Sequence, residues 1–106
     1  IPFIRTNVPP LLSTYSSGNQ LWGIAKNPWD KGRTSGGSSG GEAALIASKC
    51  SPLGIGSDIG GSLRNPAEFC GIYTIKPCSQ RLSPMGQRKS YIMKILLSFN
   101  RLSDKH

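Results

Sequence analysis

Two glycine-flanked serine clusters are the part of this sequence best suited to chemistry. Residues 36–41 read Gly-Gly-Ser-Ser-Gly-Gly, and Gly60 and Gly61 stand directly before Ser62. Glycines allow backbone conformations with positive φ and leave neighbouring N–H groups uncovered, so that these groups can face a developing negative charge. We therefore expect a reactive serine in each cluster.

Other glycine-rich motifs fit these clusters less well. A phosphate-binding P-loop needs a lysine after its last glycine, and no lysine follows either cluster. Gly54 and Gly56 begin a dinucleotide-binding pattern, but Ile59 stands where its third glycine is required. The nucleophile-elbow pattern Gly-x-Ser-x-Gly surrounds Ser38, yet the histidine that it requires could only be the last residue of the chain. A flexible Gly/Ser linker is the remaining alternative.

The segments that must position the clusters alternate between helix and strand signals. Good helix formers at residues 42–48 predict a helix that starts near Gly40. Residues 53–56 alternate as a strand does, and residues 72–75 predict another strand. Between them, Asn-Pro is typical of an N-cap followed by proline, which predicts a helix over residues 65–70. This alternation predicts an α/β fold.

The segment before the first cluster carries weaker signals. Residues 1–4 are apolar and predict a short strand, which Pro9 and Pro10 prevent from continuing. Large aromatic side chains are usually packed inside a domain, so we expect Trp22 and Trp29 in the core.

The last part of the chain differs from the rest in charge. The sequence has 13 Lys and Arg against 5 Asp and Glu, a net charge of +8, and basic residues crowd its last quarter, from Arg81 to Lys105, most of which is the tail of residues 87–106. In this basic tail Ile92, Ile95, Leu96 and Phe99 have helical spacing, which predicts a short amphipathic helix. The tail would be drawn to an anionic membrane surface or a partner; packing on its own domain is the alternative. We expect no nucleic-acid binding, because interleaved aromatic residues are few.

Length and cysteine content limit the remaining options. A chain of 106 residues is at most one domain, and without an initiator methionine we expect an internal fragment. Three cysteines without a Cys-x-x-Cys pair support neither a disulfide framework nor a zinc site. We expect an intracellular location and neither a metal ion nor another cofactor. The sequence leaves the oligomeric state open.

The glycine-rich stretch resembles, position by position, the signature of the amidase signature family. The matching positions run from Gly36 through Ser38 and Ser62 to Ala67. Within the family the chain is most similar to the fatty-acid amide hydrolase branch, on the residues Thr6-Asn7-Val8-Pro9, Tyr15, Asn27-Pro28-Trp29, Ser51-Pro52-Leu53-Gly54 and Phe69-Cys70-Gly71-Ile72. The resemblance covers residues 1–86, which we interpret as part of a catalytic domain with a mixed central sheet flanked by helices. Residues 87–106 are a divergent tail.

The resemblance implies a Ser-Ser-Lys hydrolase that cleaves a carboxamide through an acyl-enzyme. Ser62 matches the nucleophile, and Ser38 matches the serine that relays protons, with a cis peptide bond before it. The lysine base of the family lies upstream of this chain. Lys26, Lys31 and Lys49 do not stand in its sequence context.

The resemblance also implies roles for the residues around Ser62. The family's oxyanion hole matches the backbone N–H groups of Ile59, Gly60, Gly61 and Ser62. Asp58 and Arg64 match residues that hold the shape of this turn. Leu12 and Tyr15 match positions on the acyl-binding side in the fatty-acid branch.

The function expected from these matches is hydrolysis of a small-molecule lipid amide, such as a fatty-acid amide, with peripheral membrane contact. We expect the isolated chain to be inactive, because serine hydroxyls are weak nucleophiles without a base. The alternative is an inactive truncated product that acts by binding lipid or a partner.

Overall fold

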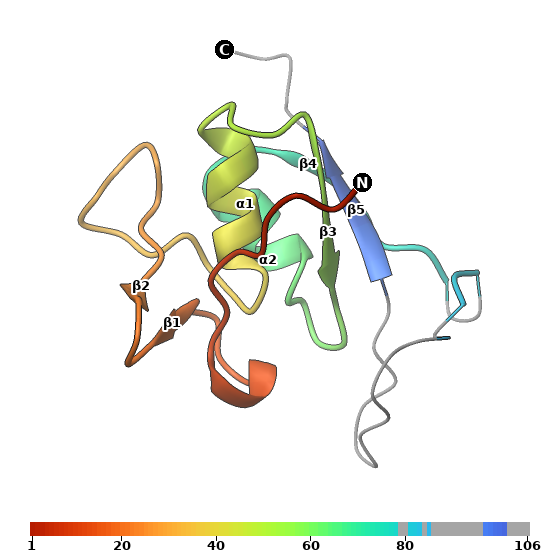
Figure 1. The fold of residues 1–106 in the computed structure, drawn as a ribbon, viewed down its shortest axis with the longest axis horizontal. Helices are drawn as coiled ribbons and strands as arrows, with labels where there is room; N and C mark the ends of the chain where they lie inside the picture. Colours follow the sequence, from red (N-terminus) through yellow and green to blue (C-terminus); the bar gives the residue numbers. More distant parts are fainter. Residues whose placement is uncertain (79–80, 84, 86–96, 102–106) are drawn as a thin grey trace.

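The computed structural model describes residues 1–78, 81–83, 85 and 97–101. The chain forms two short helices between two small sheets (Figure 1). In chain order the elements are the 3-10 helix η1 (Pro10–Leu12), β1 (Gly18–Asn19), β2 (Gly23–Ile24), α1 (Gly40–Ala47), β3 (Leu53–Ser57), α2 (Arg64–Cys70), β4 (Tyr73–Ile75) and β5 (Leu97–Arg101). The helix predicted to start near Gly40 and the strands predicted around residues 53–56 and 72–75 are confirmed.

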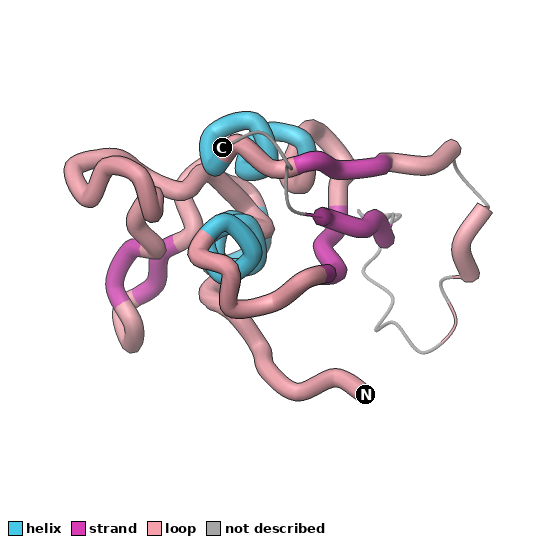
Figure 2. The backbone as a smooth tube through the Cα atoms, turned by 90° about the horizontal axis from the view of Figure 1, so that it is seen from above, coloured by secondary structure: helices cyan, strands magenta, loops and turns pink. Residues whose placement is uncertain are grey.

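The larger sheet has the strand order β3-β5-β4, and β5 is antiparallel to both of its neighbours. The helices separate this sheet from the small β1–β2 ladder in both views of the backbone (Figures 1 and 2). Helix α1 contacts β3 and β5, and α2 contacts β4. On the face away from the helices, Leu53, Ile55, Tyr73 and Ile75 are each more than half exposed. One face of the sheet is therefore apolar and uncovered.

Small residues let the two helices pack closely in the core. Ala43, Ile46 and Ala47 of α1 meet Ala67 and Cys70 of α2, together with Ile72. Gly54 of β3 is needed here, because a Cβ at this position would collide with the Glu42 carboxylate and lie 2.7 Å from Ile46 Cδ1. The core thus fixes β3, and with it the turn that follows β3, against the start of α1.

Helix α2 starts two residues earlier than its Asn-Pro signal indicates, at Arg64 instead of Pro66, and the prediction of Asn65 as N-cap is wrong. The N-cap is Leu63, whose side chain caps nothing. The free N–H groups of Leu63 and Arg64 donate instead to Asp58 Oδ2, at 3.2 and 3.1 Å. Asn65 lies inside the helix, where its Oδ1 accepts from the Gly37 N–H at 3.3 Å. The carboxylate of Asp58, in the turn before α2, therefore caps the helix in place of the N-cap side chain.

The expectations for residues 1–4 and for the two tryptophans are corrected. Residues 1–4 belong to no strand. The tryptophans lie outside the core, with Trp22 80% and Trp29 56% exposed. The Trp29 indole N–H donates to the Cys70 carbonyl at 2.8 Å, which explains how a large aromatic is held at the surface.

The amphipathic helix predicted in the tail is not observed where the chain is described. Residues 92–96 lie outside the described residues, and Leu97–Arg101 forms β5. Phe99 pairs with Ile55 of β3 and with Ile75 of β4. Pairing on both sides satisfies the backbone of β5, and such long-range pairing overrides a helical spacing over a few residues. None of the helices within the described ranges is long and apolar enough to cross a bilayer.

Candidate active site

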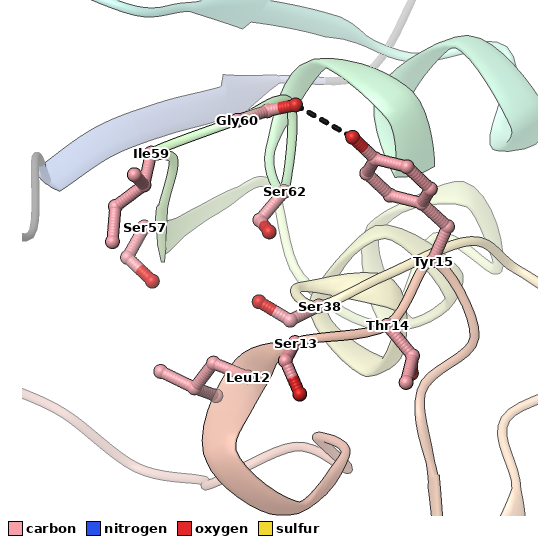
Figure 3. Close-up of a pocket in the computed structure, with 9 residues that line it drawn as sticks. All are labelled: Leu12, Ser13, Thr14, Tyr15, Ser38, Ser57, Ile59, Gly60 and Ser62. Atoms are coloured by element: carbon pink, nitrogen blue, oxygen red, sulfur yellow. Dashed lines mark hydrogen bonds between the residues drawn. The ribbon is translucent and has the colours of Figure 1, made fainter. Parts of the chain in front are cut away.

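A cavity of about 210 Å³ lies between the segment after η1, the start of α1 and the turn that follows β3 (Figure 3). It brings together residues that are far apart in the sequence. Both predicted catalytic serines line it, as do both predicted acyl-side residues and three of the four predicted oxyanion residues, one of which is the serine Ser62: Ser38, Ser62, Leu12, Tyr15, Ile59 and Gly60. The sequence matches therefore converge on one place.

The first serine cluster positions Ser38 at the floor of the cavity. The peptide bond between Gly37 and Ser38 is cis, as the resemblance implied. Gly37 lets the segment after η1 pack directly against the cluster, since a Cβ there would lie 2.6 Å from the Thr14 carbonyl oxygen and 2.7 Å from the Ser16 nitrogen. The Ser38 carbonyl accepts a hydrogen bond from Ser17 Oγ at 3.0 Å.

The Ser38 hydroxyl is a buried group that has no hydrogen-bond partner among the residues that the structure describes. Ser38 is 1% exposed, yet its Oγ makes no hydrogen bond among the described residues. Figure 3 shows the hydroxyls of Ser38 and Ser62 entering the cavity from facing sides, and no hydrogen bond joins them in the described structure. A buried hydroxyl left unpaired costs about 1–3 kcal/mol, and such groups are usually reserved for a function.

Asp58 organises the turn that carries Ser62. It is fully buried, and its carboxylate accepts from the N–H groups of Gly61, Leu63 and Arg64 at 2.8, 3.2 and 3.1 Å. The Arg64 guanidinium adds two bonds of 2.9 Å. Burial alone would raise the pKa of Asp58, but the hydrogen bonds from Arg64 and the backbone outweigh it and hold the pKa well below its usual range. Asp58 thus stays ionised and keeps the turn closed.

The backbone N–H groups of this turn divide into two sets. Those of Ile59, Gly60 and Ser62 have no hydrogen-bond partner in the described part of the chain, and all three residues line the cavity. The Gly61 N–H instead donates to Asp58 Oδ1, and Gly61 does not line the cavity. Three of the four donors expected in the oxyanion hole are therefore uncommitted, and Gly61 is not among them.

The acyl-side residues come from the end of η1, at Leu12, and from the segment that follows it, at Tyr15. Tyr15 is half exposed, and its hydroxyl donates to the Gly60 carbonyl at 2.8 Å (Figure 3). Leu12 lines the cavity with φ +55°, a region that costs a leucine about 1–2 kcal/mol. Ser13, which stands where the fatty-acid branch has an aromatic residue, also lines the cavity, and sequence reasoning missed two further lining residues, Thr14 and Ser57. The position of Ser57 at the end of a strand, directly before Asp58, was the available signal.

No basic side chain enters the described cavity. Its described lining contains neither lysine nor histidine. Lys26 and Lys31 instead line a second, open groove of about 370 Å³ beside the outer side of α1. Cys70 is buried, and desolvation raises the pKa of its thiol to about 11, so it is no nucleophile at neutral pH. Among the described residues no group of three or more metal-ligating side chains gathers.

The sequence matches the Amidase family over residues 1–93. It is 52% identical to fatty-acid amide hydrolase 1 of Sus scrofa over 90 residues, which cover 85% of this chain and 16% of that protein. It is 50% identical to a glutamyl-tRNA(Gln) amidotransferase protein of Legionella pneumophila subsp. pneumophila over 82 residues, covering 77% of this chain and 17% of that protein.

Among solved structures, 6-aminohexanoate cyclic dimer hydrolase superposes with a TM-score of 0.87 at 33% identity, over 93% of this chain and 21% of that one. This likeness confirms the predicted fold class. The chain spans only about a sixth of the length of the two curated relatives, with shares of 16% and 17%. It is a fragment-sized member of the amidase family, similar to fatty-acid amide hydrolases.

Proposed function

We propose that this chain supplies the nucleophile, the proton relay and the oxyanion hole of a serine amidase that acts on fatty-acid amides or similar lipid amides. The observation that carries the proposal is the cavity in which Ser38 and Ser62 face each other beside uncommitted N–H groups. A nucleophile, a relay and preorganised donors are what acyl transfer requires.

The mechanism follows from this arrangement. Ser62 Oγ attacks the amide carbonyl carbon, and the N–H groups of Ile59, Gly60 and Ser62 stabilise the oxyanion that forms. Ser38 accepts the proton of Ser62 and passes its own proton to a base; the reverse relay protonates the leaving amine. Water then hydrolyses the ester on Ser62. The buried hydroxyl of Ser38, which no described residue bonds, supports this role, because a relay needs room for a partner on each side.

The base belongs to a part of the amidase domain outside this chain. In the family it is a lysine, and the described lining of the cavity holds none. Without that base, Ser62 would attack amides very slowly, since an unactivated hydroxyl is a weak nucleophile. The isolated chain is therefore inactive under this proposal, and a complete domain restores activity.

The lipid part of the proposal rests on the wall beside the serines and on the relatives. Leu12 and Ile59 give this wall apolar surface. Leu11, next to it, is 86% exposed. The Sus scrofa relative is named a fatty-acid amide hydrolase. The relative from Legionella is named for a different reaction, so the acyl group needs a direct test.

A chimera tests the function. Residues 1–86 of this chain would replace the matching segment of the Sus scrofa enzyme, and hydrolysis of a long-chain fatty-acid amide would be compared with that of a short-chain amide. We expect hydrolysis with preference for the long chain. Ser62→Ala should abolish it, and Ser38→Ala should lower kcat by about a hundredfold or more. Activity that survives Ser62→Ala would refute the nucleophile, and preference for the short chain would refute the lipid substrate.

One observation favours a second function. The outer face of the sheet exposes four large apolar side chains, Leu53, Ile55, Tyr73 and Ile75, and a patch of this kind marks a binding surface. A chain without its base would then act by binding a lipid surface or a partner, inside the cell and at a membrane. Flotation of the full chain with anionic liposomes, compared between wild type and Ile55→Gln, separates this function from catalysis, because the substitution keeps β5 in the sheet. Loss of flotation in the variant would support it, and absence of flotation of the wild type would refute membrane contact.

A further inference from the structure

The peptide group that joins Gly60 to Gly61 is held at both of its polar atoms. Its carbonyl oxygen accepts from the Tyr15 hydroxyl at 2.8 Å. Its N–H donates to Asp58 Oδ1, also at 2.8 Å. Because a peptide group is planar and its C=O and N–H point in opposite directions, bonds at both ends fix the orientation of the plane. Two side chains therefore clamp this one peptide.

The Asp58 end of the clamp is rigid. Asp58 is fully buried and holds the N–H groups of Leu63 and Arg64 in addition to that of Gly61. Its position is fixed by the start of α2 and by the bidentate contact with the Arg64 guanidinium. The carboxylate cannot move without breaking several bonds at once.

The Tyr15 end comes from a segment 45 residues away in the sequence. The backbone of Tyr15 packs directly on Gly37, as the close approach of Thr14 and Ser16 to that glycine indicates. The ring is half exposed, but it lies beside Gly61, where a Cβ would be 3.7 Å from both Cε1 and the hydroxyl oxygen. Tyr15 thus links the first serine cluster to the turn that holds the second.

The clamp controls the two donors on either side of it. Rotation of the Gly60–Gly61 plane changes ψ of Gly60 and φ of Gly61, which is +119° and accessible mainly to glycine. The Gly60 N–H belongs to the peptide before the clamped one, and the Ser62 N–H belongs to the peptide after it. The directions of these two groups relative to the clamped plane are therefore set by φ and ψ of Gly60 and of Gly61. Two adjacent glycines would otherwise leave the turn free to sample other orientations, and a misaligned donor contributes little to an oxyanion hole.

We propose that Tyr15 is a positioning residue: its hydroxyl, acting with Asp58, clamps the Gly60–Gly61 peptide so that the N–H groups of Gly60 and Ser62 stay aimed at the carbonyl oxygen of the amide. The Gly61 N–H has a structural role and does not touch the substrate. This inference rests on the proposed function, and it assigns Tyr15 more than the acyl-side role that the resemblance implies.

Hydrogen exchange tests the clamp without any need for catalysis. In the 106-residue chain labelled with ¹⁵N, the exchange rate of the Gly61 amide would be compared among wild type, Tyr15→Phe and the matched control Tyr73→Phe. Tyr73 is also about half exposed, at 53%, and lies in β4 away from the cavity. Removing one hydrogen bond should speed exchange at Gly61 about two- to tenfold, while amides of α1 stay unchanged. Equal rates in the two variants would overturn the clamp.

Kinetics in the chimera separate positioning from acyl binding. A positioning role predicts that Tyr15→Phe lowers kcat about tenfold, with KM within about twofold for long and short acyl chains alike, whereas Tyr73→Phe changes neither. A rise in KM that grows with acyl length, at unchanged kcat, would overturn the proposal in favour of an acyl contact. If the wild-type chimera hydrolyses no amide, the proposed function fails, and hydrogen exchange at Gly61 still decides the clamp.

Discussion

Replacement of Asp58 by alanine should destabilise the fold more than any other single loss of charge in the described structure. The substitution leaves the backbone N–H groups of Gly61, Leu63 and Arg64 without their acceptor. At about 1 kcal/mol for each unpaired donor, the loss is about 3 kcal/mol. The Arg64 side chain adds little, because it is 55% exposed and water can replace the carboxylate. For a domain of this size the expected fall in Tm is about 10 °C or more.

Urea unfolding followed by circular dichroism measures this loss. The matched control is Asp30→Ala, which removes an exposed ion pair with Arg33 whose side chains are 54% and 80% accessible. Such pairs contribute about 0–1 kcal/mol. If Asp58→Ala lowered the free energy of unfolding no more than Asp30→Ala does, the turn would not depend on Asp58, and the account of the oxyanion hole would fail with it.

Further predictions concern pH, thiol reactivity and packing. Because the folded-state pKa of Asp58 is lowered, the stabilisation that Asp58 contributes is complete above about pH 4 and is lost as the pH falls toward the lowered value. The free energy of unfolding of the wild type should therefore fall more steeply below pH 4 than that of Asp58→Asn. If the two free energies fell in parallel with pH, this prediction would be contradicted. Cys50 and Cys78, which are exposed, should react with Ellman's reagent in the folded chain, whereas the buried Cys70 should react only after unfolding. Titration should therefore count two thiols in buffer and three in urea, and three fast-reacting thiols in the folded chain would refute the described core. Gly54→Ala should cost about 2 kcal/mol in urea unfolding, because its Cβ collides with side chains of α1. Gly60→Ala is the control in this stability measurement, because the nearest atom to a Cβ at Gly60 would be the Tyr15 hydroxyl oxygen at 4.0 Å. If both substitutions lowered the free energy of unfolding equally, the close packing of Gly54 against α1 would be contradicted.

Local signals predicted the elements next to the serines. The run of good helix formers after Gly41 predicts α1. The glycine pattern of β3 likewise marks a strand that another element approaches closely, and Gly54 meets α1 there. These predictions succeeded because each feature depends on residues that are neighbours in the sequence.

Contacts between residues that are not neighbours in the sequence explain why other features were predicted wrongly or not at all. The start of α2 was misplaced because its cap is a carboxylate from the turn before it, and Asn65 is engaged by Gly37. The strand at Leu97–Arg101 follows from pairing with β3 and β4, to which a local helical spacing gives no clue. The bond from Tyr15 to Gly60 spans 45 residues and leaves no trace in either segment.

The same distinction explains how a short chain can carry the part of an active site that we propose. The oxyanion turn is shaped within residues 58–64, where Asp58 holds the backbone and Arg64 holds Asp58. The contact of Tyr15 with Gly60 and the packing on Gly37 then join this turn to Ser38. Donors and hydroxyls can thus be preorganised by residues of this chain alone. The removal of a proton from the serines cannot be provided by this chain alone, because the described lining of the cavity contains no base. Turnover should therefore depend on the part of the domain that brings the base, whereas the geometry of the oxyanion hole should not.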